Sequence, residues 1–228
     1  FNSNLKYTIK DNFEDLVLPP VDVFPAQVRS DVKEYLRRLE GRVVIGRAQF
    51  DYHLTPKKNN HLMFTAGILE EMFNGYGFEY LYFQPRKNYA YGFELFNVQK
   101  RDYGLRFGTL DYKQTTGHLN FYYRNYGRIP FDAKISYGKY LAGDVGGTIE
   151  LSRRYKNGAK FGVYATFTDV TAEQFGEGSF DKGLFFSIPI YKDFIDYTWS
   201  PLTKDPGSKI LRKHTLNDLL VKFRSYNY

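Results

Sequence analysis

A strict alternation of apolar and polar side chains recurs along this chain and limits its fold more than any other feature. The stretch RRYKNGAKFGVYATF, residues 153–167, has two alternating runs around an Asn-Gly pair. Asn-Gly between such runs is the strongest short-range signal of a β-hairpin. One face of this hairpin is apolar, with Tyr155, Phe161, Val163, Ala165 and Phe167, and the other holds Arg154, Lys160, Gly162, Tyr164 and Thr166.

The same period of two predicts strands over most of the chain after residue 40. Successive side chains of a strand point to opposite faces, so each alternating run indicates a strand with two chemically different faces. With a short strand at Leu5–Ile9 and another near the C-terminus, the runs predict about twelve strands. They cover residues 44–54, 62–69, 76–84, 89–99, 112–124, 130–139, 146–155, 159–169, 182–190 and 194–200.

The connections between these strands alternate between short and long. TPKKNN, PRKN, NYGR and KNG are short, whereas EMFNGYG, QKRDYGLRFGTLD, YLAGDVG and TDVTAEQFGEGSFDKG are longer. This alternation is typical of outer-membrane barrels, in which the short turns are periplasmic. A soluble lipocalin-like barrel is also a meander, but it has about eight strands. We therefore expect an all-β fold, a transmembrane up-and-down antiparallel β-barrel, as a single domain over residues 1–228.

One segment departs from the β pattern and predicts a short helix near residues 30–39. In SDVKEYLRRLEG, Ser30 is a suitable N-cap, Asp31 lies in the first turn and Gly41 follows the end. The helix belongs to an irregular insertion over residues 11–40. Its apolar residues share one face, so we expect it to pack on the rest of the domain. They are Val28, Val32, Leu36 and Leu39.

The apolar face of the strands has three possible neighbours: the core of a soluble protein, a ligand cavity or lipid. Aromatic residues make up 19% of the chain, with 21 Tyr and 21 Phe, and the tyrosines gather toward strand ends. An aliphatic face with tyrosines at its ends is typical of a lipid-facing surface with aromatic girdles. The sequence thus favours lipid outside and a polar lumen. The tyrosines are Tyr52, Tyr82, Tyr89, Tyr91, Tyr123, Tyr137 and Tyr155.

Charge and hydropathy argue against two other classes of protein. The net charge is +7, but the basic residues are scattered among Asp and Glu, which argues against a nucleic-acid partner. The mean hydropathy is −0.50, and no run approaches the roughly 18 apolar residues of a transmembrane helix. The chain has no cysteine, which excludes a disulfide framework and thiolate-bound metal.

The polar faces carry charges of both signs, which we expect to meet in the lumen rather than to perform catalysis. Glu70 and Glu71 are adjacent, so as strand neighbours they point to opposite faces and cannot act on one bond. The four histidines lack the spacing of a metal site. We therefore expect no catalytic residue, metal or cofactor. The lumen-facing candidates are Glu79, Glu94, His118, Arg124, Lys134, Glu150 and Arg154.

The stretch QKRDYGLRFG adds a second group of candidates, Lys100, Arg101, Asp102 and Arg106. One interpretation is a charged loop in solvent. The other is a loop folded into the barrel mouth, where its charges pair with lumen groups or contact an anionic sugar. The sequence leaves both open.

Several longer stretches are specific enough for comparison with known families. VRSDVKEYL, LEEMFNGYGFEYLY, QKRDYGLRFG and LDYKQTTGHLNFYY precede a part that includes YLAGDVGGTIELSRRYKNGAKFG and WSPLTKDPGSKILRKHTLNDL. Over residues 19–218 the chain resembles the YjbH/GfcD family of exopolysaccharide and capsule outer-membrane proteins. The resemblance implies an outer-membrane β-barrel that accompanies polysaccharide-export operons and has no known enzymatic activity. Because family members are longer at the N-terminus, it also implies either the C-terminal barrel of such a protein or a short member.

These observations lead to one expected function and two alternatives. We expect a β-barrel of a Gram-negative outer membrane that takes part in export or assembly of surface exopolysaccharide or capsule and is not an enzyme. Its expected partners are outer-membrane lipid, the polysaccharide, and periplasmic or outer-membrane polysaccharide-export proteins. The alternatives are a general or substrate-selective porin and a soluble barrel that binds a small hydrophobic ligand.

Overall fold

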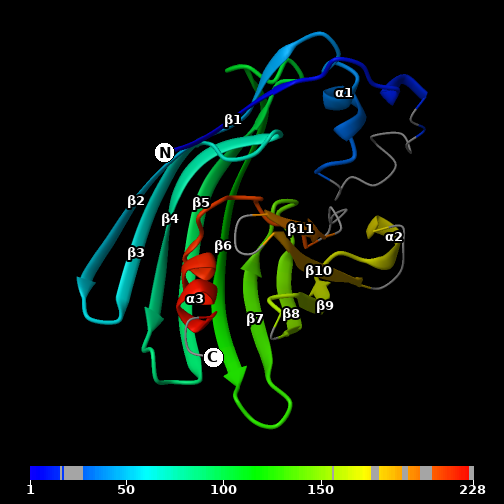
Figure 1. Ribbon diagram of the computed structural model, residues 1–228. Coiled ribbons are helices and arrows are strands. Elements are labelled where there is room, and N and C mark those ends of the chain that lie inside the picture. The colour runs from blue at the N-terminus through cyan, green and yellow to red at the C-terminus, as the bar shows by residue number, and fades with distance from the viewer. Residues whose placement is uncertain are drawn as a thin grey trace.

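One antiparallel β-sheet dominates the computed structural model, which describes residues 1–15, 17, 28–155, 157–175, 180–191, 195–200 and 207–225. Its 11 strands lie in sequence order, so each pairs with its neighbours along the chain (Figure 1). This meander confirms the all-β, up-and-down antiparallel prediction. The strands are β1 (Asn2–Tyr7), β2 (Val43–Lys57), β3 (Asn60–Ile68), β4 (Phe73–Phe83), β5 (Tyr89–Arg101), β6 (Thr109–Asn125), β7 (Phe131–Lys139), β8 (Val145–Arg154), β9 (Lys160–Thr168), β10 (Asp181–Tyr191) and β11 (Ile195–Trp199).

The sheet is strongly curved, and its concave side holds the C-terminal part of the chain (Figure 1). At the two edges, β1 pairs only with β2 and β11 only with β10. The described residues therefore form an open curved sheet of 11 strands. They do not close into the expected barrel of about twelve strands, because β1 and β11 are not paired with each other.

Helices are few and short among the described residues. They are η1 (Phe13–Asp15) and α1 (Val32–Leu36) between β1 and β2, α2 (Ala172–Phe175) between β9 and β10, and α3 (Leu216–Ser225) after β11. None of the helices described here has the length and apolar character needed to cross a membrane. The strand expected near the C-terminus is wrong, because this part forms α3. Its Leu216 and Leu220 are four residues apart and so lie on one helical face, buried in a single cluster.

Short connections lie at one end of the sheet, as predicted. Lys58 and Asn59 alone join β2 to β3, and Asn59 has the positive φ of 66° that a tight hairpin requires. In the turn between β8 and β9, Gly158 has a φ of 86° and the Asn157 side chain accepts a hydrogen bond from the Ala159 N–H at 3.1 Å. Lys156 of this turn lies outside the described residues.

Two connections at the opposite end are shorter than expected. The stretch EMFNGYG is mostly strand, because β4 begins at Phe73, and QKRDYGLRFGTLD loses its first residues to β5, which continues to Arg101. The two extensions pair with each other, with Phe73 opposite Lys100. Lys100 and Arg101 are therefore strand residues rather than loop residues, which corrects their predicted position.

The apolar faces of the strands point outward and the polar faces point into the concave side, as the alternation predicts. On β9, Val163 is 46% exposed whereas Thr166 is 4% exposed; on β7, Ile135 is 48% exposed and Ser136 is 1% exposed. The apolar face is thus not the core of a soluble sandwich. Other large apolar side chains exposed on the strands include Phe50, Tyr52, Phe64, Phe93, Leu95, Leu119, Phe121, Ile149, Leu151, Phe167, Leu184 and Tyr197.

The predicted helix is shorter than expected but packs as predicted. α1 covers five residues rather than 30–39, and its N-cap is Asp31 instead of Ser30. The Asp31 carboxylate does not cap the helix, because it accepts hydrogen bonds from Lys100 and Tyr103. Residues 16 and 18–27 of the expected insertion lie outside the described part of the chain. The surrounding cluster contains Val28, Tyr35, Leu39, Val44, Leu69, Met72, Phe73, Phe96, Val98, Leu105 and Leu141, with Val32 and Leu36 packed against it.

Candidate functional site: the polar interior and the segment inside it

Three of the predicted lumen residues lie side by side on β4, β5 and β6. The strand register places Glu79 opposite Glu94, and Glu94 opposite His118. His118 Nδ1 lies 3.0 Å from Glu94 Oε1. Because carboxylates directly opposite each other on neighbouring strands repel, Glu79 and Glu94 require a cation between them.

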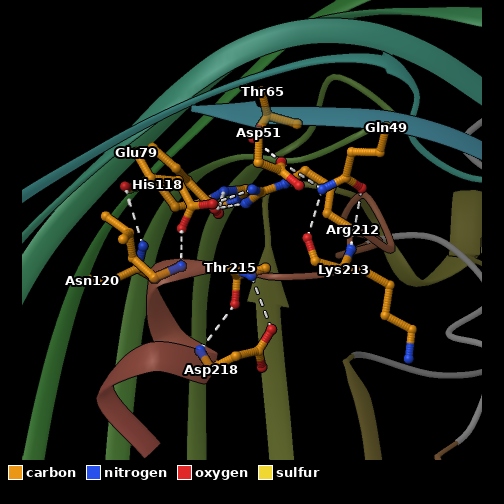
Figure 2. Close-up of polar contacts among 12 residues, drawn as sticks. Gln49, Asp51, Thr65, Glu79, His118, Asn120, Arg212, Lys213, Thr215 and Asp218 are labelled. Carbon is orange, nitrogen blue, oxygen red and sulfur yellow. Dashed lines mark hydrogen bonds and ion pairs between the residues drawn. The ribbon is translucent and has the colours of Figure 1, made fainter. Parts of the chain in front are cut away.

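Arg212 supplies that cation from residues 207–221, which we name the interior segment. This segment runs along the concave side of the sheet and ends within α3, whose first residues belong to it (Figures 1 and 2). Arg212 Nη1 pairs with Glu79, and Nη2 lies 2.7 Å from Glu94 Oε2. The guanidinium carbon also lies 4.0 Å from the centroid of the Phe96 ring, within the range of a cation–π contact. With its side chain only 5% exposed, Arg212 joins the interior segment to two strands at once.

Helix α3 begins directly after this contact with a reciprocal cap. The Thr215 N–H donates to Asp218 Oδ2 at 2.9 Å, and the Asp218 N–H donates to Thr215 Oγ1 at 3.1 Å (Figure 2). This capping box satisfies two free N–H groups of the helix within the segment itself. The Leu216 N–H donates to Glu79 Oε2 at 3.1 Å, so Glu79 accepts from both Arg212 and the helix start.

The rest of the interior segment is held mostly by contacts between a side chain and a backbone atom. Such contacts involve β2 and the connections between β3 and β4 and between β7 and β8. They join Gly207 N to Asp144 Oδ2 (2.8 Å), Leu211 O to Arg47 Nη2 (2.8 Å), Leu211 N to Glu70 Oε2 (3.2 Å) and Lys213 O to Gln49 Nε2 (2.6 Å). In addition, the Leu141 N–H donates to the Ser208 carbonyl at 3.0 Å.

A buried ion pair fastens the start of the interior segment. Arg29 Nη2 lies 2.8 Å from Glu70 Oε1, and Arg29 Nη1 donates to the Ser208 hydroxyl. Arg29 and Glu70 are each 5% exposed, so Glu70 is a buried structural partner of Arg29. Glu71 points elsewhere and pairs with Lys6.

The remaining lumen candidates lie on the later strands and form separate pairs. Arg124 and Asp132 make a two-pronged ion pair, with Nε–Oδ1 at 2.6 Å and Nη2–Oδ2 at 2.8 Å. Lys134 lies opposite Glu150 in the register, and its Nζ is 5.7 Å from the centroid of the Tyr122 ring.

Glu150 and Arg154 complete this second group. Glu150 Oε1 lies 3.8 Å from Lys160 Nζ, and Arg154 Nη1 donates a long hydrogen bond of 3.4 Å to the Gly158 carbonyl. The structure therefore brings Glu79, Glu94 and His118 together in one cluster with Arg212, and it places Arg124 and Arg154 in contacts of their own.

Lys100 and Arg101 tie the long connections to the sheet. Lys100 Nζ lies 2.7 Å from Asp31 Oδ1, which anchors α1. Arg101 is 1% exposed and donates to the carbonyls of Ile45, Glu71 and Arg106 at 2.8 to 2.9 Å. Both side chains thus bind other groups of the same chain.

Asp102 and Arg106 belong to the connection after β5. Asp102 Oδ1 accepts from the Gly104 N–H at 2.8 Å and so shapes the turn. Arg106 is exposed, and its carbonyl is the atom that Arg101 contacts. Of the four candidates, only these two lie in the loop that the sequence predicts.

Lys209 is the most strongly perturbed base of the interior segment. Burial lowers the pKa of its ammonium group to about 7, and the neighbouring positive charge of Lys134 contributes in the same direction. Its Nζ lies 5.5 Å from the centroid of the Tyr140 ring. Asp144, which holds Gly207, has a raised pKa because burial disfavours its carboxylate. Lys209 of the segment and Asp144 beside it are therefore groups whose charged forms burial disfavours.

Neither a metal centre nor a large enclosed cavity stands out in the described part of the chain. Within it, no group of three His, Asp or Glu side chains could hold a metal ion. Two of the four histidines, His53 and His61, do meet, as a stacked pair with centroids 5.5 Å apart. A cleft of about 340 Å³ opens between β1, β2 and α1, and the paired charges Lys6–Glu71 and Arg29–Glu70 line it.

Sequence reasoning missed the residues that occupy the interior, above all Arg212, Lys209 and Arg29. No local pattern marks them, because Arg212 lies 133 residues from Glu79 and 118 from Glu94. One available signal was that Glu79 and Glu94 share the polar face of two strands joined by the short connection PRKN, which brings two negative charges together.

Comparison with known proteins gives one family and one relative. The family described as "Exopolysaccharide biosynthesis protein YbjH" matches residues 1–222. The chain is 34% identical over 220 residues to "Uncharacterized lipoprotein YjbH" of Escherichia coli (strain K12). The match covers 92% of this chain but 31% of the relative, so the chain spans about a third of that protein's length. No solved structure matches.

Proposed function

Because the chain belongs to the YjbH family of exopolysaccharide biosynthesis proteins, we propose that it acts as an outer-membrane β-barrel in the export or assembly of a surface polysaccharide. In this proposal it is not an enzyme, and its partners are outer-membrane lipid, the polysaccharide and other export proteins. The E. coli relative is named a lipoprotein, which agrees with a location at a membrane.

The outward-facing apolar surface carries this proposal. Strand after strand exposes large apolar side chains such as Ile135 and Val163, while polar neighbours such as Ser136 and Thr166 are buried. In water such a surface would be an aggregation hazard, whereas in a bilayer it is the surface that lipid requires. A soluble barrel that binds a hydrophobic ligand would have the opposite arrangement.

Membrane insertion also requires the backbone at both sheet edges to be satisfied. Unpaired N–H and C=O groups cost several kcal/mol each in hydrocarbon, so spanning sheets are closed. We therefore include in the proposal that the edges of β1 and β11 are paired in the membrane. The short turns are placed in the periplasm and the long connections, with α1 and α2, outside the cell.

The occupied interior favours a role in polysaccharide export over a general porin. A porin of this class holds a water-filled channel. Here the interior segment crosses the concave side and neutralises Glu79 and Glu94 through Arg212. Small solutes are therefore not expected to pass freely through the resting protein.

A deletion strain tests this function. Removing the gene should lower the amount of polysaccharide on the cell surface, measured by carbohydrate assay and electron microscopy, and the intact gene should restore it. The matched test variants are Val163→Arg, on the proposed lipid face, and Phe107→Arg, in the exposed connection between β5 and β6. Only Phe107→Arg should restore the polysaccharide, and unchanged polysaccharide in the deletion strain would refute the proposal.

A further inference from the structure

We infer that the interior segment is a displaceable plug that Arg212 latches to the wall and that leaves the lumen when polymer passes. The identity of the passing molecule, a polysaccharide, rests on the function proposed above. The plug itself rests on how residues 207–221 are attached to the sheet.

The interior segment is attached mainly by side-chain contacts that water or other polar groups can replace. Among the described residues, one backbone-to-backbone hydrogen bond, from Leu141 N to Ser208 O, joins the segment to the rest of the chain. The other polar contacts use side chains such as Gln49, Arg47 and Asp144. Unlike a strand in a ladder, this segment can release its partners one by one to water or to sugar hydroxyl groups.

Helix α3 is suited to move as a unit. Its capping box, Thr215 with Asp218, lies within the segment and remains intact when the segment leaves the wall. Among the described side chains of α3, Leu216 and Leu220 make the buried apolar contact with the wall, and Leu219 packs against it. They pack with Met63, Leu81, Phe83, Ala90 and Tyr122.

Arg212 is the latch because, among the described residues of the interior segment, its side chain forms the ion pairs with the wall. It neutralises two carboxylates that face each other, Glu79 and Glu94, and all three groups lie away from bulk water. Removing one partner of such a pair shifts an equilibrium by about a hundred-fold or more. Among the described residues, the ion pairs that hold the plug to the wall are thus made by this residue.

The wall that the plug covers is suited to a hydroxyl-rich polymer. Release of the segment uncovers the carboxylates of Glu79 and Glu94, the amide of Gln49 and the ring of Phe96. Carboxylates and amides bind hydroxyl groups, and an aromatic face accepts the apolar face of a sugar ring. The opened lumen therefore offers a polar path instead of a bare cavity.

The first experiment compares two neighbouring cations of the plug in the complete protein, expressed in its own outer membrane. Arg212→Ala removes the latch. Lys213→Ala removes a positive charge one residue later. The Lys213 side chain is exposed, and Lys213 contacts the Gln49 side chain through its own backbone N–H and carbonyl only (Figure 2). Nitrocefin hydrolysis by periplasmic β-lactamase in intact cells reports small-molecule entry. Arg212→Ala should raise the rate several-fold, whereas Lys213→Ala should stay near the parent.

A triple variant keeps this test decisive if Arg212→Ala does not reach the membrane. Adding Glu79→Gln and Glu94→Gln removes the uncompensated carboxylates, so the protein is expected to fold without its latch. This triple variant should still admit nitrocefin faster than the parent. If a folded latch variant, judged by its heat-modifiable gel shift, excludes nitrocefin as well as Lys213→Ala does, the plug proposal is wrong.

The second experiment locks the plug in place. Asn2 of β1 and His214 of the segment have side-chain nitrogens 3.3 Å apart, both are accessible, and the chain has no natural cysteine. A reducible two-armed maleimide should therefore join Asn2→Cys to His214→Cys. Locked cells should lose surface polysaccharide and regain it after reduction, with each single-cysteine variant as control. Normal export by locked cells would refute displacement.

The two proposals fail in different ways. If gene deletion leaves the polysaccharide unchanged, the proposed function is wrong, and the nitrocefin rates still decide whether Arg212 latches a plug. If deletion abolishes the polysaccharide but both plug experiments give parental results, the function stands and the interior segment is a fixed part of the wall.

Discussion

Replacement of Val163 by arginine tests most directly whether the outer face of the sheet lies in lipid. Val163 is the fourth of the nine residues of β9, with Leu151 and Leu184 directly opposite it on the neighbouring strands. All three are about half exposed, at 46%, 47% and 42%. The side chain thus contacts its surroundings as much as the protein, and the cost of a charge there depends on what those surroundings are.

The two environments predict different magnitudes. In a bilayer, arginine at the midplane of a barrel strand should lower the free energy of unfolding by about 2–4 kcal/mol. At a water-exposed position the change should stay within about 0.5 kcal/mol. Phe107→Arg is the control, because Phe107 is 81% exposed and lies in a connection between strands.

The measurement is a urea titration of protein refolded into lipid vesicles, followed by the gel shift of the folded form. The midpoint should fall for Val163→Arg and remain at the parental value for Phe107→Arg, with an unchanged slope for both. Equal stability of the two variants would refute the lipid-facing assignment of the strand face.

Three further predictions concern the interior and the topology. The pKa of Lys209 in the folded protein is about 7, below its ordinary value of 10.5, so between these pH values the unfolded chain binds more protons than the folded one. The free energy of unfolding should therefore rise as the pH rises from 7 to 10.5. Lys209→Met should remove the contribution of this residue to that rise in denaturation curves measured at different pH values. Arg124→Ala should destabilise by about 3 kcal/mol in urea titration, because the Asp132 carboxylate loses its two-pronged partner, and adding Asp132→Ala should recover part of that loss. A cysteine at the exposed Glu173 should react with an impermeant maleimide on intact cells whereas one at Asn157 should not, and the reverse labelling would invert the proposed topology.

The sequence by itself determined most of the strands, their two faces and the family. The alternation at 159–169 and 130–139 is local, and side-chain direction in a strand follows from backbone geometry alone, so Val163 and Thr166 had to point opposite ways. The Asn-Gly turn set the hairpin between β8 and β9 for the same reason. The quoted motifs are long enough to identify the family, which matches residues 1–222.

Only the tertiary structure decided what fills the interior. Glu79 and Glu94 become neighbours through the hairpin register, but their cation comes from Arg212, more than a hundred residues later. The helical C-terminal part and the burial of Glu70 by Arg29 likewise depend on partners that no local window contains. The sequence gives the sign of each charge. Which group of opposite charge lies beside it depends on how distant parts of the chain fold into the concave side of the sheet.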